Sequence, residues 1–200
     1  MDPNARSYNL ICGQWHTYRT TKPVNRCIAE FAAMIEPGSA VLDVGCGTGY
    51  PTASYLSERG YRVTGIDISD EMIRLARDAT IPNTEFLVCD LLEYRPSKTF
   101  DAVIAFDSLW HIPLERQERI YGIIGDLVRR GGYFLFTHGK RHGSVSGQMF
   151  GQTFTYSALD AIAVHDLLNQ NGFEVLSSIE DYAEETTGDR ELLIIARKAR

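Results

Sequence analysis

The chain has 200 residues and a mass of 22.5 kDa, a size typical of one domain. Hydrophobic residues make up 44% of it, which is enough for a full core and excludes a disordered chain. The net charge of −6 gives no electrostatic basis for binding nucleic acid. The longest apolar runs have five residues, whereas a membrane-spanning helix needs ~20, so no membrane association is expected.

Short apolar runs of β type alternate with stretches of helical period along the chain. The expected strands are Ala40–Val44, Arg62–Ile66, Glu85–Cys89, Ala102–Phe106, Tyr133–His138, Glu174–Ile179 and Leu192–Ala196. The expected helices are Val24–Ile35, Pro51–Glu58, Asp70–Asp78, Leu114–Arg129 and Ser157–Asn169. This alternation predicts an α/β fold in which a mostly parallel sheet is covered by helices on both faces.

Two segments in the last third depart from this alternation. Only the polar stretch Glu180–Glu191 joins the last two strands. Because so short a connection does not easily make a parallel crossover, these strands are expected to be antiparallel at the edge of the sheet. The segment Gly139–Thr155 is long and lacks apolar periodicity, and it is interpreted either as a functional loop over the site or as an idle surface loop.

The four cysteines lie far apart, with no CxxC motif, and predict neither a disulfide framework nor a metal site. The N-terminus lacks the basic and then apolar pattern of a secretory signal. We therefore expect a cytoplasmic protein with reduced cysteines. Residues 1–200 are expected to form one domain, with an N-terminal helical or lid segment over 1–36 and an α/β core over 37–200.

A glycine turn follows the first strand and carries the strongest functional signal. Gly45, Gly47 and Gly49 are spaced as GxGxG between a buried strand and a helix, where a ligand needs to approach the backbone closely. Tyr50 stands where the dinucleotide fingerprint GxGxxG has its third glycine or alanine. This departure disfavours NAD and FAD.

Two further carboxylates follow the next strands. Asp67 ends the second strand, at the distance from the turn that suits both hydroxyls of a ribose. Asp90 ends the third strand, where it can accept from the amino group of an adenine. The alternative for a single aspartate at such a place is a helix N-cap, but two of them in register after GxGxG favour a nucleoside-containing cofactor.

At this point the sequence resembles the class I S-adenosylmethionine-dependent methyltransferases, in particular the small-molecule branch. The resemblance extends from about Ala40 to Ala196. It is carried by the motifs Val41-Leu42-Asp43-Val44-Gly45-Cys46-Gly47-Thr48-Gly49, Gly65-Ile66-Asp67-Ile68-Ser69, Val88-Cys89-Asp90-Leu91, Phe100-Asp101-Ala102-Val103-Ile104-Ala105-Phe106 and Leu127-Val128-Arg129-Arg130-Gly131-Gly132-Tyr133. The family's fold is a Rossmann-like, doubly wound sheet of seven strands in the order 3-2-1-4-5-7-6, with strand 7 antiparallel.

The resemblance also implies a role for each residue of the cofactor site. Gly45, Cys46, Gly47 and Gly49 would pass under the methionine part of S-adenosylmethionine, and Asp43 would orient its ammonium group. Asp67 would bind the ribose and Asp90 the adenine amino group. The remaining cofactor contacts implied are Ile68, Leu91, Phe106 and Met72. S-adenosylhomocysteine would be the product.

The methyl acceptor is expected beyond the carboxyl ends of the strands, where open α/β sheets bind ligands. Trp15 and Tyr18 are interpreted either as lid residues over the substrate or as packing anchors of a helix. Trp110 is interpreted either as a substrate contact or as a cover of the sheet edge. His111 and His138 are candidate general bases, because each follows a strand end. Asp107, in the same loop as His111, is the candidate to orient its imidazole.

The resulting hypothesis is a metal-free methyltransferase that moves a methyl group to a small molecule by in-line displacement, as a monomer or homodimer. The alternatives are a non-catalytic module that binds or senses S-adenosylmethionine and a methyltransferase that acts on a protein side chain. The sequence leaves open the identity of the acceptor atom and whether a base is needed.

Overall fold

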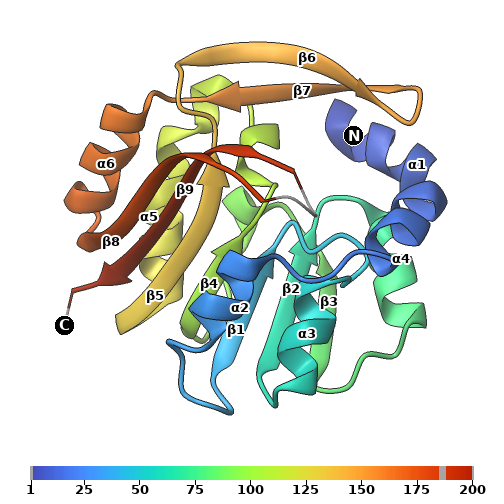
Figure 1. Cartoon of the computed structure of the whole chain (residues 1–200), viewed down its shortest axis with the longest axis horizontal. Helices are drawn as coiled ribbons and strands as arrows, with labels where there is room; N and C mark the ends of the chain where they lie inside the picture. Colours follow the sequence, from blue (N-terminus) through green and yellow to red (C-terminus); the bar gives the residue numbers. More distant parts are fainter. Residues whose placement is uncertain (1, 185–187, 200) are drawn as a thin grey trace.

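The core of the molecule is a seven-stranded sheet, described by a computed structural model for residues 2–184 and 188–199 (Figure 1). Its strands are β1 (Ala40–Val44), β2 (Arg62–Asp67), β3 (Thr84–Val88), β4 (Phe100–Ala105), β5 (Val128–His138), β8 (Phe173–Tyr182) and β9 (Arg190–Lys198). They lie in the order β3-β2-β1-β4-β5-β9-β8. Within this described sheet, β9 runs antiparallel to both of its neighbours, β5 and β8, and the other neighbouring pairs are parallel. The predicted order and the antiparallel last strand are confirmed.

Helices cover both faces of the sheet. They are α1 (Pro3–Thr20), α2 (Arg26–Ala32), α3 (Thr52–Glu58), α4 (Asp70–Asp78), α5 (Glu118–Leu127) and α6 (Ala161–Gln170), with short 3-10 turns η1 (Leu91–Glu93), η2 (Leu109–His111) and η3 (Leu114–Arg116). Alternate residues of the central strands point to opposite faces: Leu42 and Val103 pack with α5 and α6, whereas Val41 and Ile104 pack with α2, α3 and α4. The continuously apolar strands are therefore explained by burial on both sides.

Most predicted elements recur with small shifts. The strand Ala40–Val44 and the helix Asp70–Asp78 have the predicted bounds, and the Ser69 hydroxyl caps that helix by accepting from the Met72 N–H at 3.1 Å. The predicted helix from Ser157 starts later because its N-cap is Asp160, whose side chain accepts from the Ala163 N–H. Residues 185–187 of the polar stretch Glu180–Glu191 lie outside the described residues.

The segment Gly139–Thr155 is not a loop, which corrects the sequence-based expectation. It contains most of an antiparallel hairpin of β6 (Gly143–Met149) and β7 (Gln152–Ala158). Both faces of β6 are largely exposed, so its sequence shows none of the alternation that marks a half-buried strand. Phe154 of β7 is fully buried and anchors the hairpin.

Helix α1 lies beside this hairpin, and both stand over the carboxyl ends of the parallel strands (Figure 1). Asp2 caps α1 by accepting from the N–H groups of Asn4 (2.8 Å) and Ala5 (3.1 Å), and Pro3 occupies its first turn. At mid-helix, Asn9 accepts from the Ser69 hydroxyl, which joins α1 to the start of α4. No helix in the described part of the chain has the length and apolarity needed to cross a bilayer.

Candidate active site

A pocket lies where the carboxyl ends of β1 to β4 meet α1, and the glycine turn forms part of its wall. Gly45 and Gly49 have φ values of 72° and 80°, a backbone conformation that side chains disfavour. A Cβ on Gly45 would collide with the Cβ of Ser108, and one on Gly49 would lie 2.9 Å from the side chains of Ile81 and Phe86. The turn is therefore restricted to glycine by its conformation and by its neighbours.

Asp67 holds this turn in place from the end of β2. One carboxylate oxygen accepts from the Gly47 N–H and the other from the Ser69 N–H, each at 2.9 Å. Burial raises the pKa of this carboxyl group, and the backbone N–H bonds oppose that shift. Since a carboxylate has about four acceptor positions, each oxygen keeps a lone pair for a ligand hydroxyl.

Asp43 lies at the base of the pocket and is 4% exposed. Its Oδ2 is buried and has no hydrogen-bond partner in the described part of the structure. Burial, together with the neighbouring Asp67 carboxylate, raises the pKa of Asp43 to about 7, and Arg19 opposes the shift. An unsatisfied buried acceptor is costly, so this oxygen fits a cationic or hydrogen-bonding ligand group.

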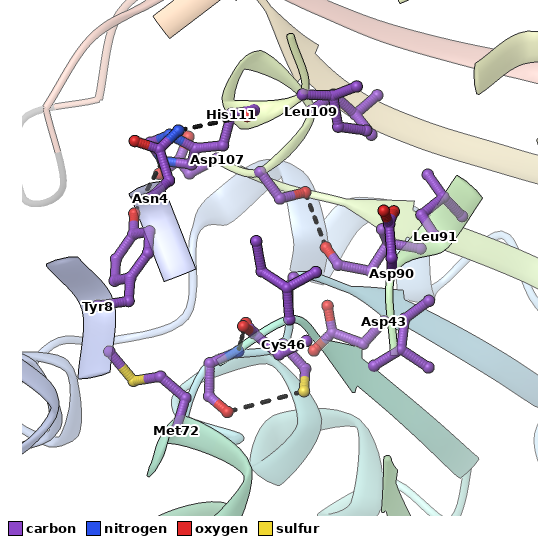
Figure 2. Close-up of a pocket in the computed structure, with 18 of the residues that line it drawn as sticks. Asn4, Tyr8, Asp43, Cys46, Met72, Asp90, Leu91, Asp107, Leu109 and His111 are labelled. Atoms are coloured by element: carbon purple, nitrogen blue, oxygen red, sulfur yellow. Dashed lines mark hydrogen bonds between the residues drawn. The ribbon is translucent and has the colours of Figure 1, made fainter. Parts of the chain in front are cut away.

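Asp90 lies on the opposite side of the pocket from Tyr8 and His111 (Figure 2). Its Oδ1 accepts from the Leu92 N–H at 2.8 Å and caps η1, while its Oδ2 lies 3.5 Å from Arg116. Asp90 is thus both the helix cap considered as an alternative and a pocket residue. The other predicted cofactor contacts that line the pocket are Gly45, Cys46, Gly47, Ile68, Met72, Leu91 and Phe106. Gly49 shapes the turn but is not among the lining residues described.

His111 lines the pocket and pairs with α1. Its Nε2 lies 2.8 Å from the Tyr8 hydroxyl, and its Nδ1 lies 3.2 Å from both the Thr155 carbonyl oxygen and the Asn4 amide nitrogen. The Asn4 amide already donates to the Thr155 carbonyl at 2.9 Å. A proton on Nδ1 satisfies this arrangement and leaves Nε2 to accept from Tyr8. Burial lowers the pKa of His111 to about 4, so the imidazole is neutral at neutral pH.

The other candidate base, His138, does not reach the pocket in the described structure, which corrects the prediction. It is fully buried, with Nε2 3.0 Å from the Gln117 Oε1 and Nδ1 2.6 Å from the Gly139 carbonyl oxygen. Burial lowers its pKa. Although His138 follows β5 as expected, Gln117 at the start of α5 covers it, so a strand-end position alone did not identify a base.

Asp107 lines the pocket, but its carboxylate is not hydrogen-bonded to His111, contrary to expectation. It accepts from Arg190 at Nε (3.0 Å) and Nη2 (2.5 Å) and from the Thr137 hydroxyl (3.2 Å). The backbone of Asp107 has a φ of 57°. In this left-handed conformation the carboxylate forms an ion pair with Arg190 of β9. The Thr155 carbonyl oxygen, which also accepts from Asn4, positions the imidazole instead.

Of the three aromatic residues predicted to contact substrate, Trp15 lines the pocket. Tyr18 is 40% exposed and packs against Trp15 and Phe150 outside the described pocket wall. Trp110 packs against Tyr156, with ring centroids 6.4 Å apart, and is likewise not a described lining residue. In this structure both side chains therefore pack against other aromatic rings, and their contact with a substrate stays a prediction.

Sequence reasoning missed the pocket residues contributed by α1. Asn4, Tyr8 and Arg19 line the pocket together with Trp15, and Arg116 lines it from η3. Positions 4, 8, 15 and 19 recur at helical spacing on one face of α1. That periodicity of polar and aromatic residues was the available signal, but nothing local indicates that the face covers a site.

The fold defines a class of protein, the doubly wound α/β domains, in which ligands bind beyond the carboxyl ends of the strands, where this pocket lies. Residues 41–132 match the model of a family described as methyltransferase domain. This stretch, which includes the glycine turn, Asp67 and Asp90, is therefore similar to methyltransferase domains.

Solved structures share the fold over nearly the whole chain. A SAM-dependent methyltransferase from Methanosarcina mazei has a TM-score of 0.71 at 24% identity, with 88% of this chain and 98% of that one covered. The Burkholderia thailandensis 1,6-didemethyltoxoflavin-N1-methyltransferase, solved with S-adenosylhomocysteine, has a TM-score of 0.66 at 20% identity, covering 100% and 92%.

Curated relatives match over shorter stretches. Phosphoethanolamine N-methyltransferase 2 of Caenorhabditis elegans is 28% identical over 148 residues, which is 69% of this chain and 33% of the relative. The chain spans about a third of the length of several curated methyltransferases that it matches.

Proposed function

We propose that this protein transfers the methyl group of S-adenosylmethionine to a small-molecule acceptor by in-line displacement. The observation that carries the proposal is the set of carboxylates at the ends of β1, β2 and β3 around one left-handed glycine turn. Asp43 has a buried, unpartnered oxygen suited to an ammonium group. Asp67 has free lone pairs suited to ribose hydroxyls, and Asp90 lies among apolar side chains suited to an adenine.

When bound, S-adenosylmethionine supplies a methyl group activated by its sulfonium charge. The chain's own contribution is to orient the ligand along this row of carboxylates and to exclude water. Helix α1 and the β6–β7 hairpin lie over the site, and such a cover suits a small acceptor better than a nucleic acid or a folded protein (Figure 1).

His111 is the group that takes up the proton lost by the methyl acceptor. Its Nε2 is neutral and unprotonated in the arrangement described, and the Tyr8 hydroxyl, also in the pocket, lies 2.8 Å from it. The acceptor's proton therefore reaches Nε2 directly or through the Tyr8 oxygen. On the other side of the ring, the Nδ1–H donates to the Thr155 carbonyl oxygen, which also accepts from the Asn4 amide.

Calorimetry with S-adenosylhomocysteine tests the cofactor site, and we expect saturable 1:1 binding with no binding of NAD. A screen of acceptors with methyl-labelled S-adenosylmethionine then tests transfer. Ligand binding without label transfer to any small molecule would favour a non-catalytic binding module. Label found on protein would favour a protein methyltransferase.

A further inference from the structure

Gln117, at the start of α5, is a fully buried amide that is not a described lining residue of the pocket. Although it stands at the N-cap position, its side chain does not cap the helix. Its Nε2 donates instead to the carbonyl oxygens of Leu109 (3.0 Å), Ile112 (2.8 Å) and Ser157 (3.2 Å). Its Oε1 lies 3.0 Å from the His138 Nε2. A buried amide is unfavourable unless its hydrogen bonds are made, and here both polar atoms have partners.

Two of these carbonyls lie on either side of His111 in the chain. Leu109 opens the turn η2 and Ile112 is its C-cap, so a single amide nitrogen binds both ends of the turn that carries His111. The Leu109 carbonyl oxygen also accepts from the Ile112 N–H at 3.1 Å, which closes the turn. The position of His111 is therefore fixed by a side chain that does not itself line the described pocket.

The third carbonyl belongs to the strand that contacts the imidazole. Ser157 lies two residues after Thr155 in β7, and the Thr155 carbonyl oxygen lies 3.2 Å from the His111 Nδ1. The Ser157 hydroxyl is 2.9 Å from that of Ser144 in β6, which ties this end of β7 to the rest of the hairpin. One amide thus joins η2 to the β6–β7 hairpin and fixes the imidazole relative to its Thr155 partner.

This arrangement gives His138 a role other than that of a base. Because three carbonyl oxygens surround the Gln117 nitrogen, turning the amide over would place its oxygen against three acceptors. The Gln117 Oε1 therefore faces His138, and a hydrogen bond there requires a proton on the His138 Nε2. The Gly139 carbonyl oxygen, 2.6 Å from Nδ1, is a second acceptor beside the same ring. A ring between two acceptors serves as a hydrogen-bond donor.

We propose that Gln117 is the positioning residue of His111, and that His138 keeps the Gln117 amide in place by donating from Nε2. This inference rests on the proposed function, in which His111 takes up the proton of the acceptor. A base acts only within hydrogen-bond reach of that proton, and small displacements of a reacting group are costly in rate. Loss of the Gln117 amide releases η2 from β7 and displaces the imidazole, whereas Asp43 and Asp67 keep their places.

The first test separates kcat from cofactor binding. Gln117→Met keeps the length of the side chain but removes its hydrogen bonds, and it should lower kcat on an identified acceptor by about 10- to 100-fold. Its affinity for S-adenosylhomocysteine in calorimetry should stay within about twofold of the parent value. Gln170→Met is the matched control, since Gln170 is exposed at the end of α6 and both values should stay unchanged. A normal kcat in Gln117→Met would overturn the proposal, and so would an equal loss of kcat and cofactor affinity.

Two substitutions of His138 distinguish a donor from a base. His138→Gln keeps an N–H donor and should retain most of kcat, whereas His138→Phe keeps a ring without a donor and should lower kcat as Gln117→Met does. His165→Phe is the control, because His165 bonds to Ser178 at 2.9 Å outside the described pocket wall. Equal kcat values in the two His138 variants would overturn the donor role. Both variants retain Gln117, so they test the proposal even where Gln117→Met does not fold.

Nitrogen NMR of the histidine rings needs no acceptor. At neutral pH the parent should show a protonated Nε2 on His138 and an unprotonated Nε2 on His111, whose pKa is about 4. In Gln117→Met the pKa of His111 should rise towards its ordinary value of 6.5, because a displaced turn admits water to the ring. An unprotonated His138 Nε2 in the parent, or an unchanged His111 in Gln117→Met, would overturn the proposal. If these resonances behaved as expected but the parent transferred no methyl group, the proposed function would fail and the placement of His111 by Gln117 would stand.

Discussion

Protonation of Asp43 should control how cofactor affinity depends on pH. In the empty pocket, burial and the Asp67 carboxylate raise the pKa of Asp43 to about 7. An ammonium group placed against Asp43 stabilises the ionised form, so binding should lower this pKa and release a proton. Cofactor affinity should therefore be highest above pH 7 and fall as the pH decreases through 7.

The magnitude follows from the fraction of Asp43 that is ionised. With a pKa of about 7, about a tenth of the empty protein is ionised at pH 6. A ligand that requires the ionised form then binds about tenfold more weakly at pH 6 than at pH 8, which corresponds to about 1.4 kcal/mol. The decisive comparison therefore lies between pH 6 and pH 8, on either side of the pKa of Asp43.

The same linkage predicts a stability effect of the opposite sign. The folded pKa of Asp43 lies above its ordinary value of 3.8, so between about pH 4 and pH 7 the folded state holds a proton that the unfolded state releases. The free energy of unfolding of the empty protein should decrease as the pH rises through this window. At 1.36 kcal/mol per pKa unit, the full effect is about 4 kcal/mol. Asp43→Asn should remove it and raise the melting temperature of the empty protein at pH 8.

Calorimetry of S-adenosylhomocysteine binding at pH 6, 7 and 8, in buffers of different ionisation enthalpy, measures both affinity and proton release. The parent protein should lose affinity towards pH 6 and release a fraction of a proton near pH 7. Asp43→Asn should bind weakly at every pH, with no change between pH 6 and pH 8. A parent protein whose affinity is equal at pH 6 and pH 8 would refute the assignment of Asp43 as an ionisable partner of the ligand.

Three further predictions concern the ribose, the base and the cover of the site. Asp67→Ala should weaken S-adenosylhomocysteine binding by about 1.5–3 kcal/mol in calorimetry, and unchanged affinity would contradict the ribose role. On an identified acceptor, His111→Ala should lower kcat by about 100-fold or more while leaving cofactor affinity intact, whereas near-normal kcat would mean that positioning alone suffices. Hydrogen exchange across α1 (Pro3–Thr20) and the β6–β7 hairpin should slow when S-adenosylhomocysteine binds, and identical rates with and without ligand would remove the support for a lid.

Local patterns in the sequence predicted the sheet and the pocket residues at the ends of β1, β2 and β3. Runs such as Ala102–Phe106 are apolar because both faces of β4 are covered. Once β1, β2 and β3 are placed, parallel topology brings Asp43, Asp67 and Asp90 to one edge. This information lies within single strands and the turns that follow them, so it is readable without tertiary contacts.

The acceptor side depended on contacts between distant parts of the chain. Asn4 bonds to His111 and Thr155, which are 107 and 151 residues away. His111 and His138 both follow strand ends, and they differ in the side chains packed against them. Gln117 bonds to His138 and separates it from the pocket, whereas His111 bonds to Tyr8 and lines the pocket with it. No local pattern encodes such coverage, which explains why one histidine was assigned correctly to the pocket and the other was not.

The continuity of α1 links the two halves of the site. Its 18 residues form one helix, so Tyr8 and Arg19 move together when it moves as a unit. The Tyr8 hydroxyl already lies 2.8 Å from the His111 Nε2, so a rigid α1 holds Tyr8 against His111 while its later turns line the glycine-turn end of the same pocket. Contacts that a ligand makes with the later turns would therefore stabilise the whole helix over the pocket, and with it the position of Tyr8. The buried, unpartnered oxygen of Asp43 is unfavourable without a ligand, so a ligand group that pairs with it would add to this stabilisation.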